Sequence, residues 1–153
     1  NMRCYWNKPD ETAEALREGW IYSGDLGYMS DDGFLYITGR AKDIIIRGGE
    51  NIACLEIENV LHLHPSVSEA AVHSAPDDRL GEIVCATILL REGCNATIED
   101  IQNHVKSHLA AFKAPSHVHF LNERLPRIAS GKVDKITLKK EAIERLEEQV
   151  SSQ

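Results

Sequence analysis

The chain is organised around residues 125–135, which read LPRIASGKVDK. Pro126 fixes one backbone φ angle and Gly131 leaves another free, and no alternation of apolar and polar residues lies between them. We therefore expect an irregular loop with Lys132 at its tip. Ser-Gly-Lys invites comparison with a phosphate-binding P-loop, which needs a glycine at the place of Pro126 and a Ser or Thr at the place of Val133. The P-loop interpretation therefore fails.

The ammonium of Lys132 can still serve an anion. A lysine on a loop is a compact, movable positive charge that suits a transient phosphate or carboxylate. The alternative is a solvated surface lysine with no specific partner, because most exposed lysines have none. The stretch by itself leaves both interpretations open.

Composition limits the class of protein. A chain of 153 residues allows one ordinary domain, or a small domain with a tail, and a 42% apolar share is enough for a packed core. With 17 Lys and Arg against 24 Asp and Glu, the net charge of −7 argues against a nucleic-acid or anionic-membrane binder. The four cysteines form no C-x-x-C pair, which predicts reduced thiols in a cytoplasmic protein. We see no signal-peptide pattern in these residues and no apolar run long enough for a transmembrane segment.

The N-terminal part predicts short elements around tight turns. Pro9-Asp10-Glu11-Thr12 opens a short helix with acidic residues in its first turn, and Gly19 stops it. Residues 20–38 predict short strands, with a hairpin turn at Asp32-Gly33. The first six residues show no helix or strand pattern, so we expect the chain to continue from a longer protein.

A junction is expected at residues 40–43, where the pattern breaks. It divides the chain into residues 1–41, a β-rich tail of a larger domain, and residues 42–153, a small domain. Residues 44–46 are a buried strand and residues 47–51 a turn, which together make a short hairpin.

The small domain predicts an α+β fold, with the hairpin and a roughly three-stranded sheet flanked by helices. Its strands are residues 67–73, 83–90 and 118–121, and a polar loop containing Pro76-Asp77-Asp78 joins the first two. A helix over residues 54–63 ends before Pro65. A second helix begins at a capping box, Thr97 to Asp100, and its apolar face continues through Leu109 and Phe112; a third is capped by Asp134 and carries Leu138, Ala142 and Leu146 on one stripe.

The seven histidines raise the question of a metal site. His104 and His108 stand one helical turn apart, but zinc needs a third ligand, and the residues between them do not supply the Glu of an H-E-x-x-H motif. We therefore assign no metal ligand. No serine or cysteine stands in a recognisable nucleophile turn, so covalent catalysis is not indicated either.

Three other features carry chemistry. Asp25 lies between Gly24 and Gly27, where its carboxylate can accept hydrogen bonds from a pair of vicinal hydroxyls such as those of a ribose. Arg40 places a permanent positive charge beside the break in structure. Gly48-Gly49 exposes backbone where no side chain blocks a narrow ligand.

These residues together resemble the adenylate-forming superfamily of acyl-CoA synthetases, luciferases and nonribosomal-peptide adenylation domains. The matching strings are WNKPDETAEAL, GWIYSGDLGYMSDDGFLYITGRAKDIIIRGGENI, LEIENVLHLHPSV and FLNERLPRIASGKVDK, in the right order and over nearly the whole chain. The form GGENI is most similar to the medium- and long-chain fatty acyl-CoA or aryl-CoA branches. One departure is Ala53-Cys54-Leu55, where the family has an aromatic residue or Ser followed by Pro-Ala. This difference lies where a helix begins and changes no residue to which the family implies a catalytic role.

The resemblance implies that a large N-terminal domain precedes this chain. The chain itself would carry the end of that domain and the whole of a C-terminal lid. It implies roles for eight residues: Lys132 is the catalytic lysine of adenylate formation, Asp25, Arg40 and Asn51 contact the nucleotide, Lys42 is the hinge, and Gly48, Gly49 and Glu50 line the CoA site. The implied substrates are a small-molecule carboxylic acid, ATP and CoA, with Mg²⁺ whose ligands lie outside this chain. A lysine acetyltransferase and a deacetylase acting on Lys132 are further implied partners.

Two rival functions stay open. An adenylation domain would deliver its acyl or aminoacyl group to the pantetheine of a carrier protein, whereas a lid-like interaction module would bind a partner without catalysis. Lys132 and Asp25 together disfavour the second, since an adaptor has no need of an ammonium on a loop.

Overall fold

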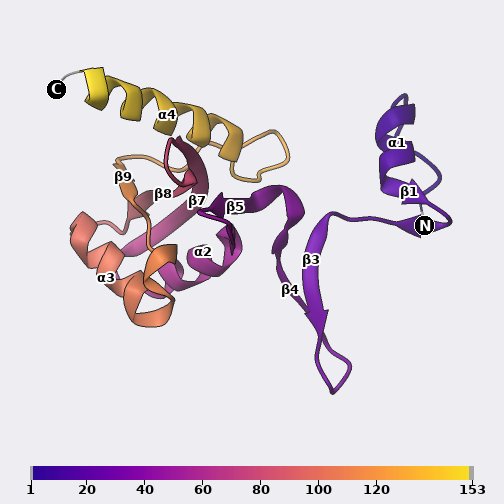
Figure 1. The fold of residues 1–153 in the computed structure, drawn as a ribbon, viewed down its shortest axis with the longest axis horizontal. Helices are drawn as coiled ribbons and strands as arrows, with labels where there is room; N and C mark the ends of the chain where they lie inside the picture. The colour runs from indigo at the N-terminus through magenta and orange to yellow at the C-terminus, as the bar shows by residue number, and fades with distance from the viewer. Residues whose placement is uncertain (1, 152–153) are drawn as a thin grey trace. The chain divides into compact units, whose positions relative to one another are not determined.

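The computed structural model describes residues 2–151, with the side chains of residues 2–148. It divides into two compact units, Asn1–Lys42 and Asp43–Gln153. Figure 1 shows the course of the chain through its elements. Within residues 2–151, no helix has the length and apolar character needed to cross a membrane.

The first unit contains a short helix and two small hairpins. Helix α1 (Pro9–Ala15) begins at the expected proline, with Asp10 and Glu11 in its first turn. It ends before Gly19, because β1 (Leu16–Arg17) and β2 (Trp20–Ile21) pair around a turn in which Glu18 and Gly19 have positive φ angles of 53° and 82°. Gly19 therefore serves the turn of a hairpin.

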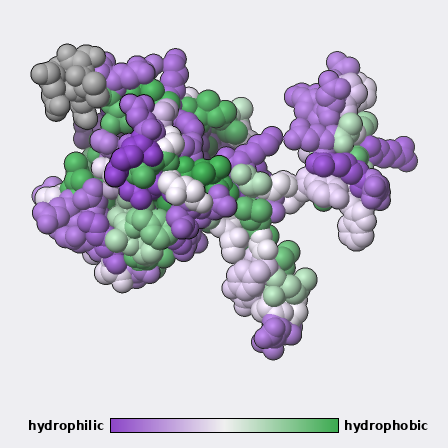
Figure 2. All heavy atoms as spheres, viewed as in Figure 1, coloured by the Kyte–Doolittle hydropathy of each residue, from purple (hydrophilic) through white to green (hydrophobic). Residues whose placement is uncertain are grey.

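Strands β3 (Asp25–Met29) and β4 (Leu35–Arg40) form the hairpin that Asp32-Gly33 predicts. Gly33 has a φ of 83°, and the Ser30 N–H donates to the Phe34 carbonyl at 2.8 Å. The hairpin leaves six large apolar or aromatic side chains exposed: Tyr28, Met29, Phe34, Leu35, Tyr36 and Ile37. Figure 2 shows a mixture of apolar and polar surface along it. Apolar surface of this extent is usually covered by another part of a protein.

The second unit has the predicted α+β class but a larger sheet. The three predicted strands are present as β7 (Val67–Asp77), β8 (Gly81–Leu90) and β9 (His117–Leu121), the last parallel to β8. The hairpin of β5 (Ile44–Arg47) and β6 (Glu50–Ala53) joins β8 where Arg47 pairs with Gly81, so the sheet has five strands in place of three.

The polar loop expected at Pro76-Asp77-Asp78 is shorter than predicted. Pro76 and Asp77 belong to β7 and pair with β8, so only residues 78–80 form the turn. Proline fits there because β7 is an edge strand, and an edge strand does not need an N–H from every residue. The Asp77 carboxylate closes the turn by accepting hydrogen bonds from the N–H groups of Arg79 and Leu80.

Helices cover both faces of the sheet (Figure 1). Helices α2 (Cys54–Leu63) and α3 (Ile98–His108) pack on one face, and α4 (Lys135–Ser151) packs on the other. Alternate residues of each strand serve the two faces. The core under α2 and α3 contains Ile57, Leu61, Val72, Val84, Ile88, Ile101 and Val105. The face under α4 carries two smaller clusters, one of Ala71, Leu125 and Leu138 and one of Ala75, Ile83 and Cys85.

The helix limits confirm part of the sequence analysis. Helix α2 covers the predicted residues, and α3 begins at the predicted capping box, in which Thr97 Oγ1 accepts from the Asp100 N–H at 3.1 Å. The predicted extension of α3 is wrong, because Leu109 is extended, with φ −131° and ψ 166°, and Phe112 lies in the 3-10 helix η2 (Ala111–Lys113). Leu109 still packs against the core, so its spacing reports burial rather than helix.

Candidate functional site

Lys132 lies at the tip of a closed turn, whereas the sequence suggested an irregular loop. Arg127 and Val133 form an isolated antiparallel bridge. Inside it, the Ile128 N–H donates to the Lys132 carbonyl at 2.9 Å and the Gly131 N–H donates to the Ile128 carbonyl at 2.8 Å. Gly131 has a φ of 83°, which explains why glycine stands before the lysine. We call residues 125–134 the lysine loop.

The lysine loop is anchored at both ends. Leu125, only 3% exposed, packs with Ala71 and Leu138 at its start. At its end, Asp134 caps α4 by accepting from the Thr137 N–H at 3.1 Å, and this hydrogen bond lowers the pKa of the Asp134 carboxyl. Between these anchors, the exposed Lys132 side chain forms no hydrogen bond or ion pair with any residue that the structure describes. A loop anchored at both ends therefore presents an ammonium that has no partner among the described residues.

Asp25 and Arg40 are brought together in the first unit. Asp25 is the first residue of β3, and not part of a turn as the sequence suggested; its cross-strand partner is Arg40. The Arg40 Nε–H donates to Asp25 Oδ1 at 2.9 Å, while the side chains remain 56% and 31% exposed. A carboxylate held by a guanidinium, and still open to solvent, can accept hydrogen bonds from ligand hydroxyls.

The glycine turn, Gly48-Gly49, connects β5 to β6. Both glycines have positive φ angles, 58° and 88°, as a two-residue hairpin turn of the primed type requires. A Cβ on Gly49 would meet no atom within 4 Å, so one side of this turn is open. Glu50 and Asn51 belong to β6, not to the turn, and both are exposed.

Lys42 is the last residue of the first unit. It lies in the 3-10 helix η1 (Ala41–Asp43), between β4 and β5. Its Nζ is 3.9 Å from Glu14 Oε1, but the Lys42 side chain is 88% exposed, so this ion pair contributes little to stability.

The lysine loop and the glycine turn belong to the same unit and are associated with opposite ends of β5. The residue that follows the lysine loop, Lys135, has its Nζ 3.8 Å from Oδ2 of Asp43, which immediately precedes β5. The glycine turn follows the last residue of β5. Lys135 Nζ also lies 2.7 Å from Glu58 Oε1. Burial lowers the pKa of Lys135, but Glu58, together with Cys54 and Asp43, outweighs burial, so the pKa is raised. Sequence reasoning missed this half-buried ion pair, which fixes the start of α4 to α2.

His104 and His108 serve structural contacts. His104 Nε2 lies 2.9 Å from the Val60 carbonyl and His108 Nδ1 lies 2.8 Å from the His104 carbonyl. Among the described residues, no group of three or more His, Cys, Asp and Glu side chains could hold a metal ion.

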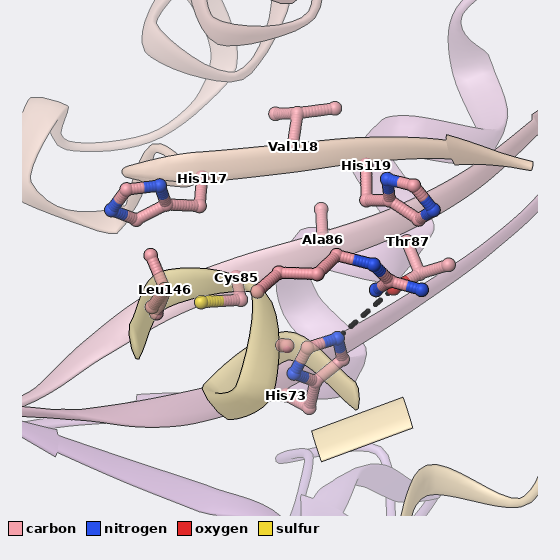
Figure 3. Close-up of a pocket in the computed structure, with 10 residues that line it drawn as sticks. His73, Cys85, Ala86, Thr87, His117, Val118, His119 and Leu146 are labelled. Atoms are coloured by element: carbon pink, nitrogen blue, oxygen red, sulfur yellow. Dashed lines mark hydrogen bonds between the residues drawn. The ribbon is translucent and has the colours of Figure 1, made fainter. Parts of the chain in front are cut away.

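A cavity of about 80 Å³ lies between the sheet and α4. The strand register places His73, Cys85 and His117 opposite one another on three neighbouring strands, and Arg145 of α4 lines the same cavity (Figure 3). Burial lowers the pKa of His73 to about 4 and raises that of Cys85 to about 11, so both are neutral near pH 7. A protonated thiol is a poor nucleophile, which makes Cys85 a packing residue.

Comparisons with known proteins agree with this arrangement. A family model described as AMP-binding enzyme C-terminal domain matches residues 56–132. The long-chain-fatty-acid–CoA ligase of Bacillus subtilis (strain 168) is 46% identical over 132 residues, which are 86% of this chain and 23% of the ligase. The fatty acid–acyl-carrier-protein ligase ScoC of Streptomyces coeruleorubidus is 45% identical over 129 residues, which are 84% of this chain and 25% of ScoC.

A solved structure gives the same result. The o-succinylbenzoate CoA synthetase of Bacillus subtilis, in complex with the acyl-adenylate intermediate OSB-AMP, superposes with a TM-score of 0.83 and 38% sequence identity. The match covers 90% of this chain and 28% of the synthetase. The chain thus spans about a quarter of the length of the relatives it matches.

Proposed function

The chain belongs to the AMP-binding enzyme C-terminal domain family, and from this we propose that it is the C-terminal part of an ATP-dependent acyl-CoA synthetase. The complete enzyme activates a carboxylic acid as acyl-AMP, releases pyrophosphate, and transfers the acyl group to CoA. The observation that carries the proposal is the Lys132 ammonium, which a closed and anchored loop presents without a partner among the described residues.

Lys132 would act in the first half-reaction. The carboxylate of the acid attacks the α-phosphorus of ATP, so two anions must approach each other while pyrophosphate leaves. A positive charge placed between them lowers this repulsion and stabilises the negative charge of the transition state. Lys132 forms no ion pair with any described residue, which supports this role, because an ion-paired ammonium would first have to lose its partner.

Asp25 and Arg40 would hold the nucleotide. The Asp25 carboxylate would accept hydrogen bonds from the vicinal ribose hydroxyls, and Arg40 would contact the ribose or a phosphate. The 2.9 Å hydrogen bond between them supports this assignment, since it orients the Asp25 carboxylate. Residues 1–41 would belong to the large domain, which would cover the apolar surface of the β3–β4 hairpin.

The glycine turn would act in the second half-reaction. Gly48, Gly49 and Glu50 would line the path of the CoA pantetheine, and Asn51 would contact a phosphate. Because the thiol must reach the adenylate that Lys132 helped to form, the lid would rotate about Lys42 between the two half-reactions. The separation of the two elements by β5 supports such an exchange.

Mg²⁺ would enter with the ATP phosphates. The described residues contain no cluster that fits a metal ion, so we assign no step to the metal here. We also propose that the enzyme is cytoplasmic and acts in fatty acid metabolism. Acetylation of Lys132 by a lysine acetyltransferase would remove the charge that adenylate formation needs, and a deacetylase would restore it.

For the thiol that accepts the acyl group, one relative suggests a specific alternative to CoA. ScoC is named as a ligase of fatty acids to acyl-carrier-protein, so the thiol could belong to a carrier protein instead of CoA. The test is to supply the complete enzyme with ATP and fatty acids of graded length, and to offer CoA and holo-carrier protein in separate reactions. We expect AMP release and an acyl-CoA thioester. Thioester on the carrier protein alone would overturn the choice of CoA, and no carboxylate-dependent pyrophosphate exchange would overturn the ligase function.

A further inference from the structure

The position of Lys132 depends on contacts elsewhere in the lysine loop. Because the Lys132 side chain has no partner in the described residues, only the loop backbone determines where its ammonium can reach. A two-residue bridge closed by a few backbone hydrogen bonds is only marginally stable in water. A residue that holds the loop backbone in place therefore determines where the Lys132 ammonium can lie.

Arg127 makes such a contact. Its Nη1–H donates to the Gly131 carbonyl at 2.8 Å, across the loop and at the residue immediately before Lys132. Its Nη2–H donates to Glu69 Oε2, also at 2.8 Å. One planar guanidinium thus connects the lysine loop to β7, on which Glu69 lies.

Glu69 is the fixed point of this arrangement. It lies in β7 opposite Leu89, and its side chain is only 15% exposed. Its second oxygen, Oε1, accepts from Arg124 Nε at 2.8 Å, so both oxygens are occupied by arginines. Burial raises the pKa of the Glu69 carboxyl, but the hydrogen bonds from Arg124 and Arg127 more than offset this and hold it below its usual range.

The geometry points to Glu69 as a positioning residue for Lys132, acting through Arg127. This inference rests on the proposed role of Lys132 in adenylate formation. Stability alone does not explain the arrangement, since Arg124 and Arg127 are 77% and 39% exposed and ion pairs of this kind contribute little to folding. A displacement of about 1 Å at a reacting group can cost a hundredfold in rate, so a weak contact suffices for a large kinetic effect.

Substitution by lysine should have a larger effect at Arg127 than at Arg124. Arg127→Lys keeps the charge but cannot join Gly131 and Glu69 at once, because an ammonium lacks the planar fork. Arg124→Lys should be mild, because Arg124 contacts Glu69 only through a single Nε–H.

The test compares half-reactions in the complete enzyme. We expect Glu69→Ala and Arg127→Lys each to lower kcat of pyrophosphate exchange by roughly ten- to a hundredfold, with KM for ATP and thioester formation from supplied acyl-adenylate unchanged. Glu56→Ala is the matched control, because it also removes a carboxylate that pairs with a basic side chain, Lys113, away from the loop. If Arg127 bound substrate directly, KM for ATP would rise in Arg127→Lys and not in Glu69→Ala, which would overturn the positioning role.

A double-mutant cycle separates this inference from the proposed function. In a Lys132→Ala background, Glu69→Ala should cause no further loss of exchange, because the group that it positions is gone. A further tenfold loss would overturn the inference and mark Glu69 as structural. If Lys132→Ala alone left exchange intact, the proposed function would fail; if Lys132→Ala reduced exchange and Glu69→Ala did not, only the positioning role would fail.

Discussion

Asp25 and Arg40 face each other across the first pair of the β3–β4 ladder, and the Arg40 Nε–H donates to Asp25 Oδ1 at 2.9 Å. They stand 15 positions apart in sequence, and the hairpin turn at Asp32-Gly33 brings them together. The pair is exposed, so it should contribute little to folding stability.

Asp25→Asn should therefore impair nucleotide use without unfolding the protein. The amide keeps the shape of the carboxylate but loses its charge, and hydrogen bonds to charged groups contribute about 1.5–3 kcal/mol. We expect kcat/KM for ATP in pyrophosphate exchange to fall by roughly ten- to a hundredfold. Asp32→Asn, in the exposed hairpin turn, is the control and should behave as wild type. Equal rates for the two variants would remove Asp25 from the nucleotide site.

Gly49→Ala tests the glycine turn. Its φ of 88° strains any residue with a Cβ, and so does the φ of 75° at Gly93, where a Cβ would likewise meet nothing within 4 Å. Both alanine variants should lose about 1–2 kcal/mol of stability. Only Gly49→Ala should slow thioester formation from supplied acyl-adenylate, while pyrophosphate exchange stays at the wild-type rate. Comparable effects of both variants on thioester formation would show that strain alone is responsible.

Lys42 tests the hinge. Proline at this position fixes φ near −65° and disfavours the helical backbone of Ala41, which lies in η1. In the complete enzyme, Lys42→Pro should keep pyrophosphate exchange within a few-fold of wild type and slow thioester formation severely. Lys42→Ala removes only an exposed side chain and should affect both half-reactions modestly. If alanine were as damaging as proline, Lys42 would act through its charge and not as a hinge.

His73 predicts a pH dependence of stability. Burial lowers its pKa to about 4 from an ordinary 6.5, so between these pH values the unfolded chain binds a proton that the folded chain does not. The contribution of His73 to the free energy of unfolding is therefore fully present above pH 6.5 and is lost as the pH falls to about 4. The whole loss is about 3 kcal/mol.

The measurement is urea unfolding of the chain, followed by circular dichroism, from pH 7 to pH 4.5. His73→Gln should be less stable than wild type at pH 7 because it loses its fit beside Thr87, yet it should lose less stability on acidification. Identical pH slopes for the two proteins would show that His73 is not neutral in the folded state.

Local patterns in the sequence predicted local features of this fold. The limits of α2, the capping box at Thr97 and the hairpin at Asp32-Gly33 depend on neighbouring residues, and the structure confirms them. Pro76 was misleading because only the sheet order reveals that β7 is an edge strand on which proline is tolerated.

Long-range contacts could not be predicted in this way. The pairing of Arg47 with Gly81, which adds the hairpin to the sheet, has no local signal. The same holds for Glu69 and Arg127, which are 58 residues apart, and for the ion pair of Lys135 with Glu58. The proposal of Lys132 as a site residue comes from its motif, but the closed turn that presents it depends on backbone hydrogen bonds that composition does not reveal.

We propose that the Lys132 ammonium serves adenylate formation alone. The deciding experiment measures both half-reactions in the complete enzyme carrying Lys132→Ala, beside Lys140→Ala as a control at an exposed lysine of α4. We expect pyrophosphate exchange to fall by about two to three orders of magnitude in Lys132→Ala, the loss typical of removing an electrostatic catalyst. Thioester formation from supplied acyl-adenylate should remain near the wild-type rate, and Lys140→Ala should change neither step. An equal loss in both half-reactions of Lys132→Ala would show that Lys132 does not act in adenylate formation alone.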